Sequence, residues 1–351
     1  MRTLKALAVA LVALVAVVPR TGAQSVPWLS ERSLPISLFE RYLESLRQQA
    51  GIPGLSAAIV QNGQRAWDAG FGYQDVQNLV RATADTPYPI LDLSQTLAST
   101  VLLQQCVELR ALNLADRVRR WNAQFSEDGT TLAQLLSHTG PDGFRYDTSR
   151  YAQLGTVIDQ CSSQRYGPLM AREVLDQLAM RDSVPGHDLG DGSATNRRLF
   201  SVSVLERYGA VLRRVAPSYR VDGNRRVSRS DYSAASLSAS TGIVSTVRDL
   251  ARFDAGLDGL LASSTRERAW QNGSTPMGLG WFVYQHNGEP VVWSFGLARD
   301  AYSALYIKVP ARGVTLILLA NSDGLAAPYT LADGNLSASP FAQVFLQLFA
   351  S

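Results

Sequence analysis

Sequence patterns typical of β-strands occur near both ends of the chain, and patterns typical of helices fill the region between them. Near the start, residues 55–61 and 64–73 flank Asn62-Gly63, a pair that strongly favours a β-hairpin turn. Near the end, alternating or apolar runs predict an antiparallel meander and then a closing helix. The predicted strands cover residues 281–285, 291–295, 303–309 and 314–320, and the closing helix covers residues 340–349.

The first 23 residues have the pattern of a secretory signal peptide. Arg2 and Lys5 precede an apolar run over residues 6–18, and small residues follow up to Ala23. The apolar run is too short for a comfortable membrane span, so we expect cleavage near Ala23. We therefore expect a periplasmic or secreted protein without a transmembrane segment in the mature chain.

Charge argues against nucleic acid as a partner. The leader holds three of the 33 basic residues, which leaves 30 to balance the 30 acidic residues. A net charge near zero gives no electrostatic attraction to a polyanion.

The two cysteines, Cys106 and Cys161, both fall in predicted helices, the second at the end of a helix expected over residues 151–161. In an oxidising compartment a disulfide between them would stabilise the fold by roughly 4 kcal/mol in the chain-entropy model. Buried thiols that pack as small apolar residues are the alternative. We expect free thiols, because nothing in the sequence brings the two helices together.

A long helix is predicted to begin near Asp92. The N-terminus of a helix concentrates free backbone N–H groups, so an anion or a nucleophile is favoured there. Asp92 and Gln95 have the spacing of an N-cap residue and its partner, which predicts a pair resembling a capping box. We favour this role over an aspartate nucleophile, which would need a base of its own.

Three segments together resemble the serine β-lactamase and penicillin-recognising D,D-peptidase family, in its class C-like and esterase branch. They are DTPYPI at residues 85–90, TLAQLLSHTG at 131–140 and TGIVSTVRDLARF at 241–253, the last being the most specific. The resemblance implies an α/β (α+β) fold in which an antiparallel sheet, built from both chain ends and flanked by helices, carries an inserted all-helical domain. We expect a sheet domain over residues 24–86 and 240–351, and a helical domain over residues 87–239.

The first motif of that family, S-x-x-K, carries the nucleophile and its lysine. Aligned from the upstream side, the serine corresponds to Asp92 and the lysine to Gln95. Aligned from the downstream side, the pair corresponds to Leu93 and Thr96. Neither alignment supplies both catalytic residues.

A third alignment takes Ser94 as the nucleophile, and it places Leu97 at the lysine position. The chain holds only two lysines, Lys5 in the leader and Lys308 far downstream. Because the family's lysine helps to activate the serine, none of the three alignments predicts a working pair.

The other two motifs are also altered. Where the family has Y-x-N, the chain keeps Tyr146 but has Thr148 in place of the asparagine. Where the family has K-T-G or H-x-G, the chain has Ser294 in place of the cation and keeps Gly296, where a side chain would crowd a ligand. His138, in the segment at 131–140, is expected to be structural.

Two further segments favour surface loops over binding sites. Residues 197–229 are rich in arginine, which could dock an anionic polymer but is more typical of a solvated loop. His187, Asp188 and Asp191 lack the regular spacing of metal ligands, so we predict no metal site and no cofactor.

These observations predict a catalytically inactive homologue of serine hydrolases that binds a small molecule or an envelope protein. One alternative is a residual hydrolase or esterase that uses Ser94 with Tyr146 as its base. Another is a structural envelope protein whose pocket is filled by its own side chains. The residues expected to line the binding site are Asp92, Ser94, Gln95, Tyr146, Thr148, Ser294 and Gly296.

Overall fold

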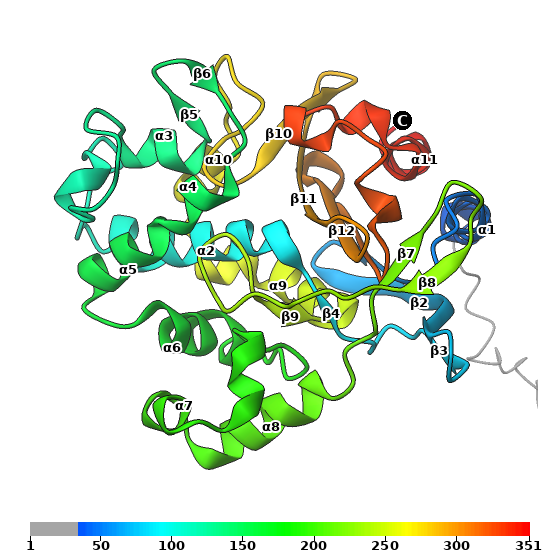
Figure 1. Cartoon of the computed structure of the whole chain (residues 1–351). Helices are drawn as coiled ribbons and strands as arrows, with labels where there is room; N and C mark the ends of the chain where they lie inside the picture. The colour runs from blue at the N-terminus through cyan, green and yellow to red at the C-terminus, as the bar shows by residue number, and fades with distance from the viewer. Residues whose placement is uncertain (1–33) are drawn as a thin grey trace, which may run out of the picture.

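A computed structural model describes residues 34–351, and its core is one seven-stranded antiparallel sheet (Figure 1). The predicted signal peptide lies outside the described residues. The strand order is β10-β11-β12-β13-β1-β2-β3. The strands are β1 (Gly54–Gln61), β2 (Gln64–Asp75), β3 (Val80–Arg81), β10 (Phe282–His286), β11 (Glu289–Ala298), β12 (Tyr302–Val309) and β13 (Val314–Ala320).

The sheet joins the two ends of the chain, as the resemblance implied. Strand β1 pairs with β13 from Leu55 opposite Ala320 to Gln61 opposite Val314. The hairpin of β1 and β2 turns at Asn62 and Gly63, whose φ angles of 50° and 73° lie in the left-handed region that such turns require. The predicted hairpin, the C-terminal meander and the fold class are therefore confirmed.

Each face of the sheet is covered by helices. Helices α1 (Leu34–Gln49) and α11 (Pro340–Phe349) pack together on one face, where the ring of Phe39 meets those of Trp67 and Phe345. Helix α9 (Val247–Leu260) lies against the opposite face, and α10 (Ser263–Ala269) follows it. The predicted closing helix at residues 340–349 is confirmed.

The region between β4 (Tyr88–Pro89) and β9 (Val244–Ser245) is mainly helical. Its helices are α2 (Ser94–Leu102), α3 (Leu132–Leu136), α4 (Thr148–Ala152), α5 (Leu154–Ser162), α6 (Tyr166–Met170), α7 (Ala194–Leu199) and α8 (Val202–Leu212). Two small hairpins, β5 (Thr139–Gly140) with β6 (Gly143–Phe144) and β7 (Tyr219–Val221) with β8 (Val227–Arg229), belong to the same region. Strands β4 and β9 pair with each other close to the expected domain limits at 87 and 239, and this division of the chain stays a prediction.

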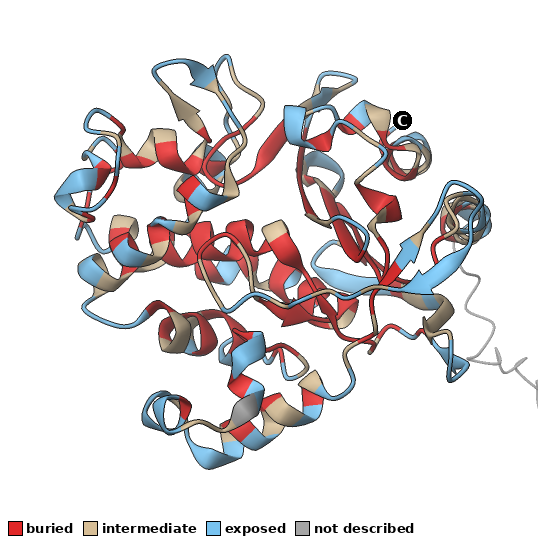
Figure 2. Cartoon of the chain, in the orientation of Figure 1, coloured by how far each residue is buried: buried red, intermediate tan, exposed pale blue. Residues whose placement is uncertain are grey.

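Helix α2 runs through the centre of the molecule, and all nine of its residues are buried (Figures 1 and 2). Helix α2 continues without a break into a wider turn at Leu103–Glu108, which carries Cys106. A helix buried on every side must pack against neighbours all round, and here these include α5 and α6. Among residues 34–351, the structure has no helix that is both long and apolar enough to cross a membrane.

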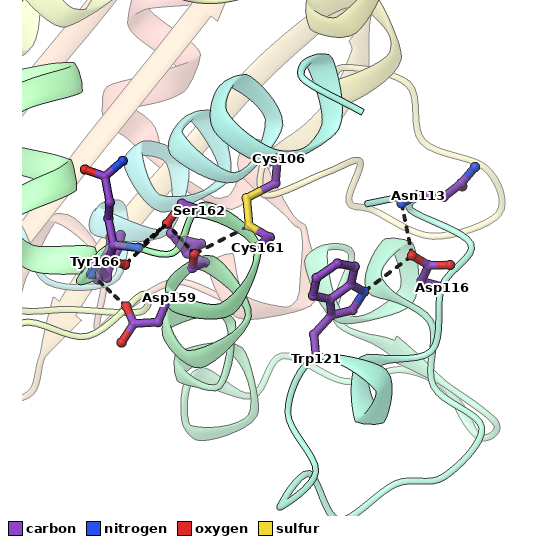
Figure 3. The surroundings of a disulfide bond; sticks show 10 residues. Cys106, Asn113, Asp116, Trp121, Asp159, Cys161, Ser162 and Tyr166 are labelled. Atoms are coloured by element: carbon purple, nitrogen blue, oxygen red, sulfur yellow. Dashed lines mark hydrogen bonds between the residues drawn. A yellow bond between two sulfur atoms is a disulfide. The ribbon is translucent and has the colours of Figure 1, made fainter. Parts of the chain in front are cut away.

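The prediction of free thiols is wrong, because Cys106 and Cys161 form a disulfide (Figure 3). Their Cα atoms are 5.9 Å apart, within the usual range for a disulfide. The bond ties the end of the central helix to α5, which packs beside it. The contact joins positions 55 residues apart, so no local sequence pattern could indicate it.

We expect the double substitution Cys106→Ala and Cys161→Ala to lower the free energy of unfolding by about 2–4 kcal/mol, because the disulfide restricts the unfolded chain. Urea unfolding of the oxidised protein and of the double variant measures the difference. A reductant should destabilise the native protein but leave the double variant unchanged. Alkylation of both cysteines in denatured, unreduced protein would contradict the bond itself.

Candidate functional site

The candidate site begins where the chain turns from β4 into α2. Leu91 has a φ angle of 56°, a left-handed conformation that costs a leucine about 1–2 kcal/mol and that is often found at functional sites. A short 3-10 turn, Leu91–Leu93, then leads directly into α2. This turn lies against strand β11.

Gly296 allows that close approach. A Cβ atom at this position would lie 2.3 Å from the carbonyl oxygen of Ile90 and 3.0 Å from Cβ of Leu91. We expected the glycine to leave space for a ligand, and the structure instead places the chain's own backbone there. Gly296 therefore fixes the start of α2 against the sheet.

Asp92 does not cap the helix, so the predicted capping box is wrong. The N-cap position of α2 is occupied by Leu93, and no side chain caps it. The N–H groups of Leu93 and Ser94 donate instead to carbonyl groups of the preceding turn, including that of Ile90, because the 3-10 turn and the helix are continuous. The Asp92 carboxylate therefore does not bond to the free N–H groups of α2.

The Asp92 carboxylate faces strand β11 and is half-buried. Burial raises its pKa to about 7, and the backbone N–H of Leu297, which donates toward the carboxylate, partly opposes this rise. Our strand prediction ended at Phe295, whereas β11 extends to Ala298, and this extension brings Leu297 into the site.

Gln95 lies three residues after Asp92 and is the hub of a neutral hydrogen-bond chain. Its Oε1 is 2.8 Å from His138 Nε2, and its Nε2 donates to the phenol oxygen of Tyr146 at 3.2 Å. The N–H of Asp147 donates to His138 Nδ1 at 2.9 Å. Since Nδ1 accepts this bond, we assign the ring proton to Nε2, which then donates to Gln95.

His138 is buried and uncharged, and the structural role expected for it stays a prediction. Burial first, and then the charge of Arg150, lower the pKa of His138 to about 3. Its ring stacks between those of Tyr146 and Tyr151, with centroid distances of 4.5 and 5.0 Å. In the upstream alignment, the position of the family's lysine would hold a glutamine that is hydrogen-bonded to two neutral partners.

Tyr146 is oriented by aromatic neighbours as well as by Gln95. Its ring lies 5.6 Å from that of Phe282 and 5.4 Å from that of Phe295. Burial, followed by the negative charge of Asp92, raises the pKa of Tyr146 well above its usual value. The phenol is consequently protonated at neutral pH.

Ser94 lies apart from this group. Its side chain is fully buried, and its Oγ has no hydrogen-bond partner among residues 34–351. Thr148 is the first residue of α4, whose N-cap is Asp147, and in the described part of the chain its hydroxyl makes no hydrogen bond to Gln95. The structure therefore brings together Asp92, Gln95 and Tyr146. Asp92 and Gln95 are the pair that the upstream alignment predicts.

Ser294 is buried in β11, two residues before Gly296 and thus on the same face of the sheet. It lies opposite Tyr306 of β12. The strand position that carries a cation in the family is therefore neutral here.

Tyr232 is affected by the charge of Asp92 and was not singled out in the sequence. Burial and then the negative charge of Asp92 raise the pKa of Tyr232. Its ring contacts that of Tyr302 edge-on at 5.1 Å. Tyr232 lies in an irregular segment between β8 and β9, where no periodic pattern could have indicated it.

Arg150 fixes the loop that carries His138 and Tyr146. Its guanidinium donates to both carboxylate oxygens of Glu127 at 2.9 Å and to the carbonyl of Thr139 at 2.7 Å. A two-pronged pair of this kind holds both partners in one orientation.

The motif at residues 241–253 has a scaffold role. Thr246 caps α9 by accepting the N–H of Asp249, and the buried Asp249 carboxylate accepts from the N–H of Asp182 and from Ser183 Oγ, each at 2.8 Å. Arg248 pairs with Asp68 on β2. The motif thus joins the helical region to the sheet.

The cavities of the structure lie away from Asp92, Gln95 and Tyr146. Five cavities of about 240 to 550 Å³ open on the described part of the chain, and Asp92, Gln95 and Tyr146 line none of these five. The largest of them lies among α5, α6 and α7. Within residues 34–351, no group of three or more His, Cys, Asp or Glu side chains is arranged to hold a metal ion.

Comparison with known families identifies the class of protein to which this sheet, with its inserted helices, belongs. The model of the Beta-lactamase family matches residues 39–337. The chain belongs to this family, which confirms the resemblance seen in its motifs.

Among curated proteins, the chain is 33% identical over 182 residues to Protein flp of Staphylococcus aureus (strain N315), covering 40% of this chain and 36% of that protein. It is 28% identical over 128 residues to the human mitochondrial serine beta-lactamase-like protein LACTB, covering 32% of this chain and 23% of that protein. The chain thus matches about a third or less of the length of these relatives.

Solved structures show the same fold. The octameric penicillin-binding protein homologue from Pyrococcus abyssi superposes with a TM-score of 0.70 and 18% identity, over 90% of this chain and 78% of that one. The D-alanine carboxypeptidase AmpC from Burkholderia cenocepacia gives a TM-score of 0.68 and 18% identity, over 88% of this chain and 98% of that one.

Proposed function

We propose that this protein is an exported, acylation-incompetent member of the Beta-lactamase family that binds a ligand or partner in the cell envelope. The observation that carries the proposal is the pair of residues at the start of α2. Asp92 occupies the position of the family's nucleophile, and Gln95 occupies that of its lysine, in contact with Tyr146. Neither side chain can perform the chemistry of the residue that it replaces.

The electrostatics of the site support this proposal. In acyl transfer, a backbone N–H group stabilises the negative charge that develops on the substrate oxygen. Here the N–H of Leu297 is directed toward the Asp92 carboxylate, which is negative when ionised. A substrate carbonyl would have to displace that carboxylate.

The residual hydrolase that uses Ser94 is less well supported. The Ser94 hydroxyl is buried in α2 and lacks a hydrogen-bond partner among residues 34–351, whereas an activated serine needs a base within reach. Tyr146, its expected base, accepts a hydrogen bond from Gln95 and stays protonated. A binding role is also favoured over a purely structural one, because Asp92, Tyr146 and Tyr232 are each partly exposed.

Export is supported by the leader pattern and by the disulfide between Cys106 and Cys161, since disulfides persist mainly in oxidising compartments. N-terminal sequencing of the protein from an envelope fraction tests this part of the proposal. A mature chain that retains Met1 would count against cleavage.

We expect the native protein not to hydrolyse a chromogenic cephalosporin. General-base assistance alone contributes roughly 10²–10⁴-fold to such a reaction, and the site provides neither the base nor the nucleophile. Turnover is measured by absorbance for the native protein, Ser94→Ala and Tyr146→Phe. Turnover that disappears in Ser94→Ala would identify Ser94 as a working nucleophile and would overturn the proposal.

A further inference from the structure

The largest cavity of the described chain lies away from the start of α2. It has a volume of about 550 Å³ and lies among α5, α6 and α7 (Figure 1). Ligand pockets in proteins usually have volumes of about 300–1,000 Å³, with mostly apolar walls and a few polar groups. Asp92, Gln95 and Tyr146 do not line this cavity, so a ligand held there would occupy a separate site.

Apolar side chains from three segments line the cavity. Leu189 belongs to a 3-10 turn, Phe200 directly follows α7, and Leu237 precedes β9. Leu189 is buried, and the other two side chains are half-buried. Leu237 packs over α6, because its Cδ2 lies 3.7 Å from the position that a Cβ atom of Gly167 would take. Folding thus brings distant segments together around a space that can take an apolar group.

A glycine leaves room on the opposite wall. Gly155 lies in the first turn of α5 and lines the cavity. Apart from its own helix backbone and its chain neighbours, no atom of residues 34–351 lies within 4 Å of the position that its Cβ would take. A side chain at this position would therefore extend into empty space.

Asp159, one helical turn after Gly155, places a half-buried carboxylate at the cavity wall. Its Oδ1 accepts the N–H of Tyr166, another lining residue, at 2.7 Å (Figure 3). Burial raises the pKa of Asp159, and the N–H of Tyr166 and then the charge of Arg165 partly oppose this rise. Among residues 34–351, no cationic side chain forms an ion pair with Asp159. An ammonium group would therefore be a favourable partner for this carboxylate.

Positive charge lines the same cavity. Arg165 and Arg198 are both lining residues, and both are exposed. Within the described range 34–351, neither guanidinium forms an ion pair with a carboxylate. Arg165 is close enough to Asp159 to affect its pKa, yet the two side chains do not pair. Asp188 adds a second exposed acid. Charges of both signs thus border one apolar cavity without neutralising each other through direct pairs.

We infer that this cavity binds a small apolar zwitterion, either an amino acid or a short peptide. Its ammonium group pairs with Asp159, its carboxylate pairs with Arg165, and its apolar side chain lies against Leu237. A ligand with a single charge would leave one of the two charged side chains without a partner. The inference goes beyond the proposed function and does not depend on it, because none of these residues belongs to the start of α2.

The test is calorimetric titration of the full chain at pH 7 with three probes that share one ring. They are L-phenylalanine, 2-phenylethylamine, which lacks the carboxylate, and 3-phenylpropanoate, which lacks the ammonium group. We expect phenylalanine to bind roughly tenfold more tightly than either of the others. Equal or tighter binding of a probe with one charge would overturn the assignment to a zwitterion. Absence of phenylalanine binding would overturn the inference as a whole.

A variant that fills the cavity locates the ligand. Gly155→Trp should abolish phenylalanine binding, because the indole would occupy the empty space. The matched control is Gly259→Trp in the last turn of α9, where a Cβ also has open space and no cavity of the five is lined. Thermal unfolding checks that both variants fold. Undiminished phenylalanine binding in folded Gly155→Trp would overturn the inference.

Two charge variants test the pairing directly. Asp159→Asn keeps an oxygen that can accept the N–H of Tyr166, and it should weaken phenylalanine and 2-phenylethylamine roughly tenfold while sparing 3-phenylpropanoate. Arg165→Gln should weaken phenylalanine and 3-phenylpropanoate while sparing 2-phenylethylamine. A general loosening of the fold would not produce this reciprocal pattern. An equal loss for all three probes in both variants would overturn the assignment of the two charges.

The dipeptide alanylphenylalanine distinguishes the two sources of the zwitterion. Tighter binding of the dipeptide than of phenylalanine would identify peptides as the ligands, and weaker binding would identify free amino acids. A protein that binds none of these probes and does not turn over cephalosporin retains the proposed function and loses only this inference.

Discussion

Replacing Asp92 with asparagine is expected to stabilise the protein by about 2–4 kcal/mol at pH 8. The pKa of Asp92 is about 7 in the folded protein, against about 4 in an unfolded chain. Each unit of pKa difference corresponds to about 1.4 kcal/mol between the two states. Asparagine keeps an oxygen that can accept the N–H of Leu297 and removes the buried charge.

The sign of the pH dependence follows from the raised pKa. Below about pH 4 Asp92 is protonated in both states and costs nothing. Between about pH 4 and 7 the folded protein holds a proton that the unfolded chain has lost, so the free energy of unfolding falls as pH rises. Above about pH 7 the full cost is present, and Asp92→Asn should show the largest advantage there.

Urea unfolding at pH 4, 6 and 8 measures this difference. The variant should match the native protein at pH 4 and exceed it progressively toward pH 8, while Asp258→Asn, the same change at an exposed position on α9, should follow the native curve. An Asp92→Asn variant that is less stable than the native protein at pH 8 would mean that the carboxylate has a partner that we have not identified.

Removing the carboxylate of Asp254 is expected to destabilise the protein by about 3–5 kcal/mol. One oxygen of this buried side chain on α9 accepts from the phenol of Tyr306, from Lys308 Nζ at 2.8 Å and from Thr315 Oγ1 at 3.0 Å. Asp254→Ala leaves Lys308, itself only 15% exposed, without its counterion. Truncating one partner of a buried ion pair typically costs this much.

The matched control is Asp258→Ala on the same helix, where the aspartate side chain is 79% exposed and should contribute less than about 1 kcal/mol. Exchanging both partners, in Asp254→Leu with Lys308→Met, should recover much of the loss because no charge is left unpaired. Equal effects of Asp254→Ala and Asp258→Ala in urea unfolding would show that the hydrogen bonds of Asp254 to Tyr306, Lys308 and Thr315 do not hold α9 to the sheet.

Much of the fold could be predicted from the sequence because its signals are local. The Asn62-Gly63 turn, the alternating strands of the meander and the closing helix each follow from residues that are neighbours in the chain. The segment at 241–253 also marked the return to the sheet. These features depend on backbone preferences and periodicity, which a single sequence contains.

The site was only partly predictable, because its geometry depends on contacts between distant segments. The spacing of Asp92 and Gln95 is the same in a helix cap and in a pair with other contacts. The sequence did not indicate the 3-10 turn that precedes α2 and leaves the helix without a side-chain cap. Tyr232 lies in an irregular segment between β8 and β9, and Cys106 meets Cys161 only through helix packing. The positive φ angle of Leu91 could not be predicted either, because leucine rarely adopts this backbone conformation.

The alignment of the first motif was left open by the sequence and is better defined by hydrogen bonds. Gln95 hydrogen-bonds with both His138 and Tyr146, whereas the Ser94 hydroxyl has no hydrogen-bond partner among residues 34–351. These contacts favour the upstream alignment, Asp92 with Gln95, which stays a prediction.

The central claim is that the start of α2 carries no working nucleophile. Intact-mass spectrometry of the native protein after prolonged incubation with a penicillin tests this most directly, with Ser94→Ala and Asp92→Asn treated in parallel. We predict that the mass of all three proteins is unchanged. An increase equal to one penicillin, located on α2 by peptide mapping and lost in either variant, would contradict the claim and identify the nucleophile.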